Sequence, residues 1–448
     1  MYSLNIESII TEYHSEYQHF LDEFGDAKVE EIIFSKSCPN SLPKAFLIDQ
    51  LISQKKVHQK IPSWTFAKGL VYPPPIHVEQ SSSEWTGRYK AKLVETEIII
   101  DGTGGMGVDS YFFAKEGIEL WYVESNPDLC CITKNNFNVL GIDARVISGS
   151  LENFLVSHEF TELCNSPRTL GLFLDPSRRI LGNKIISIEN SEPNLFELWK
   201  QISTNVDQLM VKASPMAHID EVINKAYSPD SIHAVSVNNE LKELLYYYRF
   251  TDDSQSIKDK AQINYHAVDI KKNEAVVQAQ DSFTVLANKE GIVPVNVSYA
   301  EADQLSKQNS SGIFNGQEHV DGLNIYLYDP IVGAKKLGCM DHVGAKFDLL
   351  KLNKHTHLYY SKDLIPHFPG RIFELLDGFS PSNKSLKKWF KNYSYKFINI
   401  WALNYPLSSK AIKKKYGIQD GGELTLIFTR LYPDRHWVFV VKRISRFG

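Results

Sequence analysis

The N-terminal part of the chain carries its apolar residues at helical spacing. Apolar positions recur with a helical period over Leu4–Leu21, which predicts one long helix, and Pro43–Val57 predicts a second. Consecutive prolines at 73–75 then end helical structure, because proline lacks the backbone N–H that a helix interior requires. We therefore expect residues 1–80 to form an N-terminal helical region.

Beyond residue 80 the pattern changes to short apolar strands that alternate with helices. The expected strands are Glu97–Asp101, Ile118–Val123, Ala144–Ile147, Leu170–Leu174, Gln208–Val211 and Ile232–Val237. The expected helices are one that begins at Glu84 with Ser83 as its cap, Val108–Lys115, Pro127–Leu140, Leu151–His158, Leu195–Thr204, Ile219–Ala226 and Leu241–Tyr248. This alternation predicts an α/β domain over 81–270, a doubly wound sheet with a mainly parallel core.

After residue 250 the pattern is weaker and mixes short strands with helices. The expected elements are the strands Asn264–Ile270, Ser282–Ala287, Phe397–Leu403, Leu424–Leu431 and Trp437–Val441, and the helices Ala345–Leu352 and Ser409–Tyr416. Residues 252–260 are polar and predict a loop, and Gly378–Asn383 has the composition of a linker. We expect an α+β domain over 271–377 and a final domain over 378–448.

The composition is that of a protein with a large core and no need for metal or disulfide cross-links. The chain has 448 residues, and at roughly 100–200 residues per domain this length fits several domains. Its five cysteines match no zinc motif, no apolar run reaches about 18 residues, and no signal peptide is evident. We expect a cytoplasmic protein with no membrane span and no metal; the sequence gives no indication of oligomeric state.

Charge is distributed very unevenly along the chain. Residues 378–448 hold 14 Lys and Arg against 3 Asp and Glu, whereas the remaining residues hold 35 against 50. A basic domain on an acidic body favours a polyanionic partner, and lysines contact phosphates while aromatic residues stack on bases. The lysines interleaved with aromatic residues or grouped on the expected helix are Lys387, Lys388, Lys413, Lys414 and Lys415. RNA is the favoured partner; the alternative is a solvated basic surface over an ordinary aromatic core.

A glycine-rich turn between the first strand and the next helix is the main chemical motif. It comprises Asp101, Gly102, Thr103, Gly104, Gly105, Met106 and Gly107. Glycines let a ligand approach the backbone closely, and this turn lies where doubly wound sheets form their ligand crevice. Asp101 would repel a pyrophosphate but attract the ammonium and sulfonium of S-adenosylmethionine (SAM), and Glu124, at the end of the next strand, suits ribose hydroxyls. An ordinary tight turn with solvated acids and a dinucleotide-dependent oxidoreductase are the alternatives.

The turn resembles motif I of class I SAM-dependent methyltransferases, Asp/Glu-x-Gly-x-Gly-x-Gly. Thr103 stands at the first glycine position, a replacement similar to that in RNA-methylating members. The resemblance implies that Glu124 binds the ribose and that Ser150 lies near the adenine, where the family commonly has Asp.

Residues Asp175-Pro176-Ser177-Arg178-Arg179 resemble motif IV, the loop beside the transferable methyl group. The resemblance implies that Asp175 orients a target amine or accepts its proton, with Pro176 and Arg178 in the same catalytic loop. The loop is similar to that of uridine C5 methyltransferases, but those need a nucleophilic cysteine after the fifth strand and this chain has none there. Arg178 and Arg179 suit a substrate phosphate or carboxylate; the alternative is an ion pair with an acid of the body.

The run from Gln80 to Ala91 resembles a segment that covers the SAM site in one bacterial methyltransferase family, and Arg88 or Lys90 would pair with the SAM carboxylate. A capped surface helix is the alternative. From about residue 70 onward the chain resembles that family, which has a Rossmann-like class I sheet, a ferredoxin-like domain and a C-terminal THUMP-like domain. The resemblance implies a SAM-dependent methyltransferase acting on RNA, on a tRNA or rRNA base. The alternatives are a methyltransferase of a small molecule or protein, and a non-catalytic SAM-dependent RNA-binding protein.

Overall fold

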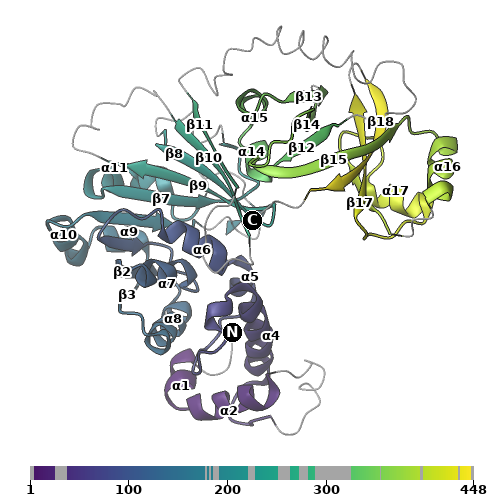
Figure 1. The fold of residues 1–448 in the computed structure, drawn as a ribbon. Helices are drawn as coiled ribbons and strands as arrows, with labels where there is room; N and C mark the ends of the chain where they lie inside the picture. Colours follow the sequence, from purple (N-terminus) through teal and green to yellow (C-terminus); the bar gives the residue numbers. More distant parts are fainter. Residues whose placement is uncertain are drawn as a thin grey trace. The chain divides into compact units, whose positions relative to one another are not determined.

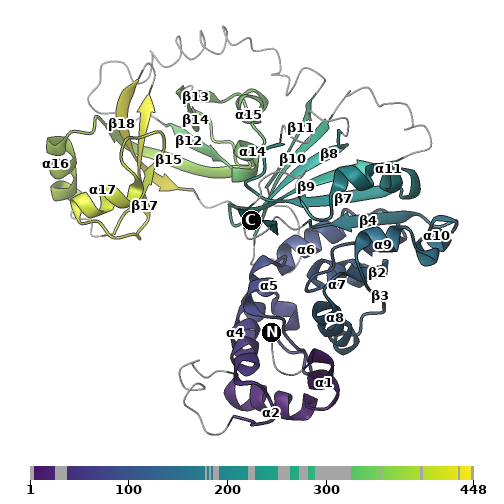
Figure 2. The same ribbon diagram turned by 180° about the vertical axis from the view of Figure 1, so that it is seen from behind.

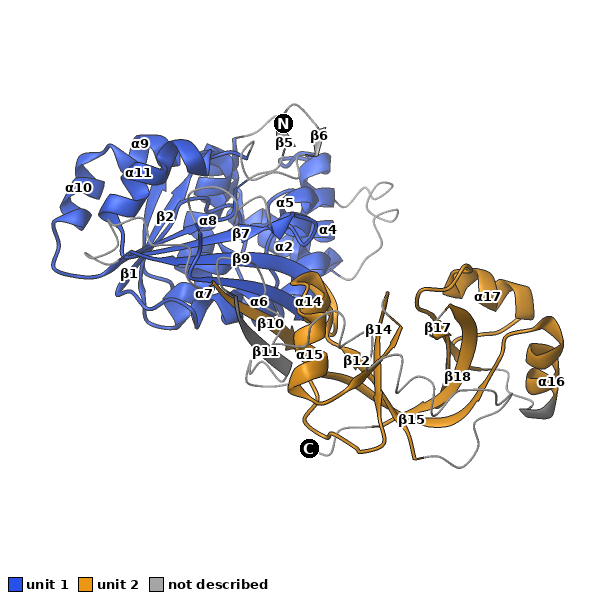
Figure 3. Cartoon of the chain, turned by 90° about the horizontal axis from the view of Figure 1, so that it is seen from above, with its two compact units in different colours: residues 1–237, 242–259, 271–278 blue, residues 238–241, 260–270, 279–448 orange. Residues whose placement is uncertain are grey.

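The computed structural model describes residues 5–25, 38–176, 179–180, 183–184, 191–219, 228–250, 263–271, 281–287, 324–353, 355–393, 397–431 and 434–444 (Figure 1). The chain divides into two compact units. Unit 1 comprises residues 1–237, 242–259 and 271–278, and unit 2 comprises 238–241, 260–270 and 279–448 (Figure 3). No helix in the described part of the chain combines the length and the apolar character that a membrane crossing demands.

The N-terminal region is helical, as expected. Its elements are α1 (Ile6–Thr11), α2 (His14–Phe24), α4 (Lys44–Lys60), the short 3-10 helix η1 (Pro62–Trp64), α5 (Pro75–Gln80) and α6 (Glu84–Ala91). Figures 1 and 2 show α1, α2 and α4 lying together near the N-terminus. The single helix expected over Leu4–Leu21 is wrong, because the chain turns at Tyr13. The buried hydroxyl of Tyr17 in α2 lies 2.9 Å from both Gln50 Oε1 and the carbonyl oxygen of Leu70, and its single proton can be donated to either acceptor.

Unit 1 is built on a sheet whose core is parallel. Its strands are β1 (Ile98–Asp101), β2 (Glu119–Glu124), β3 (Ala144–Ser148), β4 (Leu170–Leu174), β7 (Gln208–Ala213), β8 (Ser231–Val237) and β9 (Glu240–Arg249), in the order β8-β9-β7-β4-β1-β2-β3. Its helices are α7 (Val108–Lys115), α8 (Pro127–Leu140), α9 (Leu151–Leu155), α10 (His158–Cys164) and α11 (Leu195–Asn205). β3, β2, β1, β4 and β7 run parallel, whereas β9 runs antiparallel to β7. The chain moves outward from β1 to β3 and then crosses to β4 on the other side of β1, which makes the β1–β4 junction a topological switch point.

Two predictions in this sheet are wrong for local reasons. Leu241–Tyr248 is strand β9 rather than a helix: Asn238 and Asn239, with φ of 52° and 62°, form the turn that leads back from β8. Residues 243–248 are all buried, so both sides of the strand are covered, and a buried strand of this kind reads as a continuous apolar run. The helix expected over Leu151–His158 is present as α9 but ends at Leu155, because Ser157 caps a separate helix, α10, that begins at His158. The expected helix Ile219–Ala226 lies almost entirely outside the described residues.

Unit 2 holds the antiparallel pair β10 (Ile263–Ile270) and β11 (Asp281–Ala287) and a further sheet in the order β13-β14-β12-β15-β18-β17-β16. The strands of that sheet are β12 (Tyr326–Pro330), β13 (Leu350–Asn353), β14 (Thr356–Ser361), β15 (Gly370–Phe379), β16 (Asn399–Ala402), β17 (Leu424–Leu431) and β18 (Arg435–Arg443). Its helices are α14 (Val332–Lys336), α15 (Met340–Lys346), α16 (Asn383–Tyr393) and α17 (Ser409–Tyr416).

Two features of unit 2 differ from the sequence interpretation. The helix expected over Ala345–Leu352 is wrong: helix α15 ends at Lys346, Asp348 turns the chain with φ of 48°, and residues 350–352 belong to strand β13. Strand β15 runs without a break across residues 377 and 378, so its last two residues occupy the start of the linker expected at Gly378–Asn383. The loop expected over 252–260 lies outside the described residues.

Candidate functional site

Four side chains collect where parallel strands of unit 1 reach their carboxyl ends. Asp101 ends β1, Glu124 ends β2, Asp175 directly follows β4, and Lys212 is the penultimate residue of β7. The first three were expected at this position from the sequence. The crevice outside the carboxyl ends of such strands, at a switch point, is the usual ligand site of a doubly wound sheet.

The glycine-rich turn is shaped by close packing under it. Gly105 and Gly107 have φ of 56° and 75°, which favours glycine, and a Cβ on Gly107 would lie 2.6 Å from Thr133. A Cβ on Gly104 would lie 2.1 Å from the ring of Tyr122, whose hydroxyl donates to the carbonyl of Gly105 at 2.6 Å. The backbone N–H of Gly102 donates to Phe173 and that of Gly104 to Val123, each at 3.0 Å. The turn is therefore tied to β4 and to β2, and it leaves open space beside Gly105.

Glu124 is held firmly at the end of β2. Its Oε2 accepts the N–H of Gly105 and its Oε1 accepts the N–H of Asn126, each at 2.7 Å. Oε1 also accepts from the Ser125 hydroxyl at 3.4 Å, whereas Oε2 has a second lone pair and can accept a further hydrogen bond. The side chain thus joins the glycine-rich turn to the second strand and retains capacity for hydroxyl donors.

Asp101 is buried among other acids. Its Oδ2 accepts from the Ser110 hydroxyl at 2.6 Å and its Oδ1 from the N–H of Thr103 at 3.2 Å. Burial, together with the negative charges of Asp109 and Asp175, outweighs these hydrogen bonds and raises the pKa of Asp101 to about 7. A positively charged ligand beside this carboxylate would stabilise its ionised form.

Thr103 links the glycine-rich turn to the loop after β4. Its hydroxyl oxygen accepts the backbone N–H of Asp175 at 2.6 Å. A glycine in its place would leave this N–H without that partner. The replacement of the usual glycine by Thr103 therefore has a structural reason, and it fixes the start of the loop that carries Asp175 and the buried Pro176.

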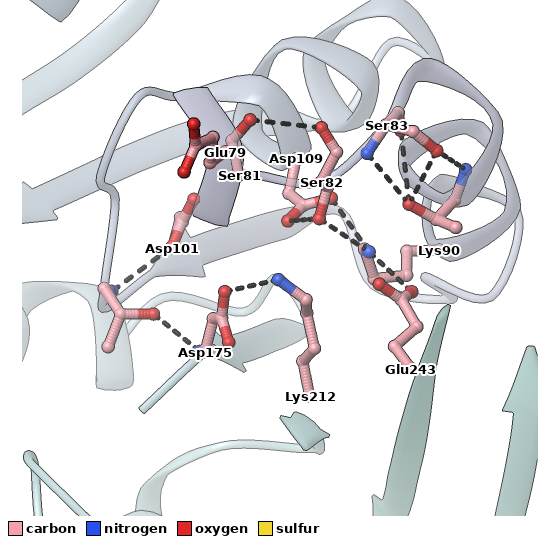
Figure 4. A network of polar contacts seen from close by, with 12 residues as sticks. Glu79, Ser81, Ser82, Ser83, Lys90, Asp101, Asp109, Asp175, Lys212 and Glu243 are labelled. Atoms are coloured by element: carbon pink, nitrogen blue, oxygen red, sulfur yellow. Dashed lines mark hydrogen bonds and ion pairs between the residues drawn. The ribbon is translucent and has the colours of Figure 1, made fainter. Parts of the chain in front are cut away.

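Lys212 is the site residue that sequence reasoning missed. Its ammonium forms an ion pair with Oδ2 of Asp175 (Figure 4). Burial opposes its charge, but Asp175, Asp109 and Glu243 outweigh burial and raise the pKa of Lys212. In the sequence, the segment around Lys212 was notable only for lacking a cysteine nucleophile.

Lys90, expected to bind a cofactor carboxylate, lies in a buried polar network behind the crevice. The Lys90 ammonium contacts Glu243 at 2.7 Å, the Ser82 hydroxyl at 3.0 Å and Asp109 at 3.1 Å, and its side chain has 0% exposure (Figure 4). The hydroxyl of Ser82 in turn donates to Asp109 at 2.6 Å. The serine run before α6 therefore serves this network, and Ser83 caps α6 as expected.

The other predicted site residues have local partners or no described environment. Arg88 binds Glu84 through two N–H groups, at 3.0 and 2.8 Å, and lies over the ring of Phe112. Ser150 caps α9, its hydroxyl accepting the N–H of Asn153. Arg178 lies outside the described residues, and Arg179 belongs to β5 (Arg179–Ile180), a short strand paired with β6 (Asn183–Lys184).

The lysines expected to bind RNA lie on two helices, α16 and α17, which cover one side of β16, β17 and β18. Leu386 and Trp389 of α16 and Ile412 of α17 pack in one apolar cluster with these strands. Trp389 is therefore a core residue, as the alternative interpretation of the aromatic pattern has it. Four of the expected lysines remain exposed: Lys387, Lys388, Lys414 and Lys415. The fifth, Lys413, is partly buried and pairs with Asp420 at 2.5 Å.

The fold and domain composition agree with known proteins. Residues 326–369 match the family model of a ferredoxin-like domain, and residues 370–443 match that of a THUMP-like domain. A protein from Porphyromonas gingivalis W83, provisionally described as a methyltransferase, has a solved structure that superposes with a TM-score of 0.75 at 23% identity, covering 97% of this chain and 99% of that one. The chain therefore has this methyltransferase-like α/β fold with ferredoxin-like and THUMP-like domains.

Partial similarities extend to two archaeal proteins. One is a provisionally described RNA methyltransferase from Pyrococcus horikoshii, with 13% identity, 45% and 98% coverage of this and that chain, and a TM-score of 0.27. The other is a tRNA (uracil-54, C5)-methyltransferase from Pyrococcus abyssi, with 15% identity, 41% and 39% coverage, and a TM-score of 0.22. No curated protein sequence matches the chain.

Proposed function

We propose that this chain is a SAM-dependent methyltransferase that acts on RNA. The observation that carries the proposal is the group of acidic side chains at the carboxyl ends of the strands beside the switch point: Asp101, with a pKa raised to about 7 by burial and by neighbouring acids, is suited to a cationic ligand. SAM brings an ammonium and a sulfonium, whereas a dinucleotide brings a pyrophosphate that these acids would repel. SAM and dinucleotides would bind at the same position in the fold, and the charge of the ligand distinguishes the two cofactor classes.

The residues of the crevice fit SAM in chemistry. Asp101 would take the ammonium end, the backbone beside Gly105 would leave room for close approach, and Glu124 would accept the ribose hydroxyls. Bound SAM supplies the methyl group. The segment expected to cover the site contains two candidate cations, Arg88 and Lys90. The Arg88 guanidinium pairs with Glu84 but is partly exposed, whereas Lys90 is enclosed in its network. Of these two, the partly exposed Arg88 is the better placed for a cofactor carboxylate, and Ser150 stays our proposal for the adenine side.

The proposed RNA substrate rests on unit 2. A THUMP-like domain with exposed lysines on α16 and α17 offers phosphate contacts, and the charge of residues 378–448 is strongly positive. We propose that this basic surface, together with Arg179 and Arg178 of the catalytic loop, holds the RNA while Asp175 works at the acceptor. A cytoplasmic location follows from such a substrate.

Methyl transfer from tritiated SAM tests the proposal. Purified protein is incubated with total small RNA from a strain that lacks the gene, and the RNA is counted after protein removal. Label in RNA that disappears in Asp175→Ala and falls in a variant with the four exposed lysines changed to Gln supports the proposal. SAM binding without label in RNA would refute the RNA substrate and favour a small-molecule or protein acceptor, or a non-catalytic binder.

A further inference from the structure

The Lys212–Asp175 ion pair lies at the boundary between the buried network and solvent. Side-chain exposure is 29% for Asp175 and 8% for Lys212, whereas it is 3% for Glu243 and 0% for Lys90. Asp109 of the same cluster is 9% exposed, so Asp175 is the member that an acceptor molecule reaches most readily, and Lys212 is its ion-pair partner. It also lies beside the glycine-rich turn, because the N–H of Asp175 binds the Thr103 hydroxyl.

A second layer of charges supports this pair from behind. Lys90 bridges Glu243 and Asp109, at 2.7 and 3.1 Å, and both of these acids also act electrostatically on Lys212. Positive and negative groups thus alternate in space although they come from α6, α7, β7, β9 and the loop after β4 (Figure 4). A cluster so interlocked keeps the Lys212 ammonium charged and in place.

A fixed ammonium at the point of transfer discriminates between acceptor atoms. A base nitrogen becomes positively charged as it attacks a methyl group; the Asp175 carboxylate favours that charge, but the Lys212 ammonium paired with it opposes it, so the pair as a whole gives such a nitrogen little stabilisation. A hydroxyl oxygen gains negative charge as its proton leaves, so the same ammonium lowers the barrier and the carboxylate takes the proton. The loop also has no aromatic side chain directly after Pro176 on which a flipped base would stack.

Resting on the proposed function, we propose that the acceptor is a hydroxyl of RNA, the ribose 2′-hydroxyl, with Lys212 binding its oxygen and Asp175 removing its proton. Within an RNA chain the 3′ and 5′ oxygens are esterified, so the 2′-hydroxyl is the free alcohol of each nucleotide. The oxygen forms a bond to the methyl carbon as the carbon–sulfur bond breaks, its electron pair stays on sulfur, and the hydroxyl proton passes to Asp175. This replaces the amine acceptor that the resemblance to motif IV implies for Asp175.

The position of the label decides between ribose and base. RNA methylated with tritiated SAM is hydrolysed in alkali, which needs a free 2′-hydroxyl next to each phosphate. A methylated ribose leaves a labelled, alkali-stable dinucleotide, whereas a methylated base gives a labelled mononucleotide. The dinucleotide is the expected product. Label in mononucleotides would overturn this inference and leave the proposed function standing, and no label in RNA would overturn both.

Binding supplies a readout that does not depend on turnover. With S-adenosylhomocysteine present, an RNA oligonucleotide that spans the mapped site should bind about tenfold more tightly than its 2′-deoxy counterpart at that nucleotide, the effect of one charged hydrogen bond. Lys212→Met should remove the discrimination, and Lys134→Met, which changes an exposed lysine of α8, should retain it. Equal binding of both oligonucleotides by the wild-type protein would contradict the role of Lys212.

Folding of the variants is controlled within the same pair. Lys212→Met leaves the carboxylate of Asp175 without its partner, so the double variant Lys212→Met/Asp175→Asn, which removes both charges, is measured beside it. Both should lose methyl transfer by at least about 100-fold, the usual contribution of a positioned acid–base group. A folded double variant that methylates RNA at the wild-type rate would refute the assignment.

Discussion

Asp101 should lower the stability of the ligand-free protein above neutral pH. Its pKa in the folded protein is about 7, compared with an ordinary value of 3.8. Between these values the unfolded chain has released the proton while the folded protein still holds it. The contribution of Asp101 to stability is therefore fully present below about pH 4 and is lost as the pH rises through about 7. Asp101→Asn, which has no such proton, should be most stabilising at alkaline pH.

The size of the effect follows from the shift. The pKa of Asp101 differs by about 3 units between the folded and unfolded states, and each unit corresponds to about 1.4 kcal/mol. At pH 8, Asp101→Asn should therefore raise the free energy of unfolding by at most about 4 kcal/mol. The variant can retain both local hydrogen bonds: the amide oxygen accepts from the N–H of Thr103, and the amide nitrogen donates to the Ser110 hydroxyl. The substitution thus removes the charge with little change in packing.

Urea denaturation of wild type and variant, monitored by tryptophan fluorescence at about pH 5 and pH 8, measures this difference. Asp143→Asn, an exposed carboxylate of the same unit, is the control and should change stability little at either pH. We expect the gap between Asp101→Asn and wild type to widen as the pH rises. A variant that is less stable than wild type at pH 8, or a gap that does not depend on pH, would refute the burial argument.

The remaining predictions concern the turn and the basic surface. Thr103→Val should cost about 1 kcal/mol of unfolding free energy, because it removes the acceptor for the N–H of Asp175, whereas Thr103→Ser should not; equal losses in calorimetry would contradict this. Gly104→Ala should destabilise by about 1–3 kcal/mol, since its Cβ would overlap the Tyr122 ring, and an unchanged melting temperature would contradict the packing. When Gln replaces the exposed lysines Lys387, Lys388, Lys414 and Lys415, RNA affinity should fall less steeply with salt concentration. The slope of log affinity against log salt should decrease by roughly 0.7–0.9 for each phosphate that the protein no longer binds. An unchanged slope would exclude this surface.

The glycine-rich turn and the elements around it could be predicted because their signals are local. The helices Val108–Lys115 and Pro127–Leu140 have their expected bounds: one begins after Gly107 and the other is capped by Asn126 and ends before Gly141. Strand ends in a parallel sheet meet at one edge, so Asp101, Glu124 and Asp175 could be brought together from sequence alone.

The partners of these acids could not be predicted, because they depend on contacts between distant segments. The sequence predicts a helix over Leu241–Tyr248, so it gives no sign that Glu243 contacts Lys90 across 153 positions of the chain. Interpreting Asn238-Asn239 as a hairpin turn would have predicted β9 and placed Glu243 on a strand. Lys212 is the penultimate residue of an apolar strand, and only the fold shows that Asp175 lies beside it.

The boundary of the basic domain illustrates a different limit. A change in charge near residue 378 is a property of the surface, whereas the backbone of β15 continues through it to pair with β18. Removing residues 378–448 would therefore break a sheet, and point substitutions are the sound way to test the basic surface.

Calorimetric titration of SAM into the ligand-free protein, with NAD as the comparison ligand, is the sharpest test of the proposed cofactor. We predict binding of SAM at a single site, no binding of NAD, and at least about tenfold weaker SAM binding in Glu124→Gln and Asp101→Asn, each of which removes a charge-assisted hydrogen bond. SAM affinity should also increase as the pH rises from about 5 to 8, because the ammonium favours ionised Asp101. Absence of SAM binding, or binding of NAD in its place, would contradict the proposal.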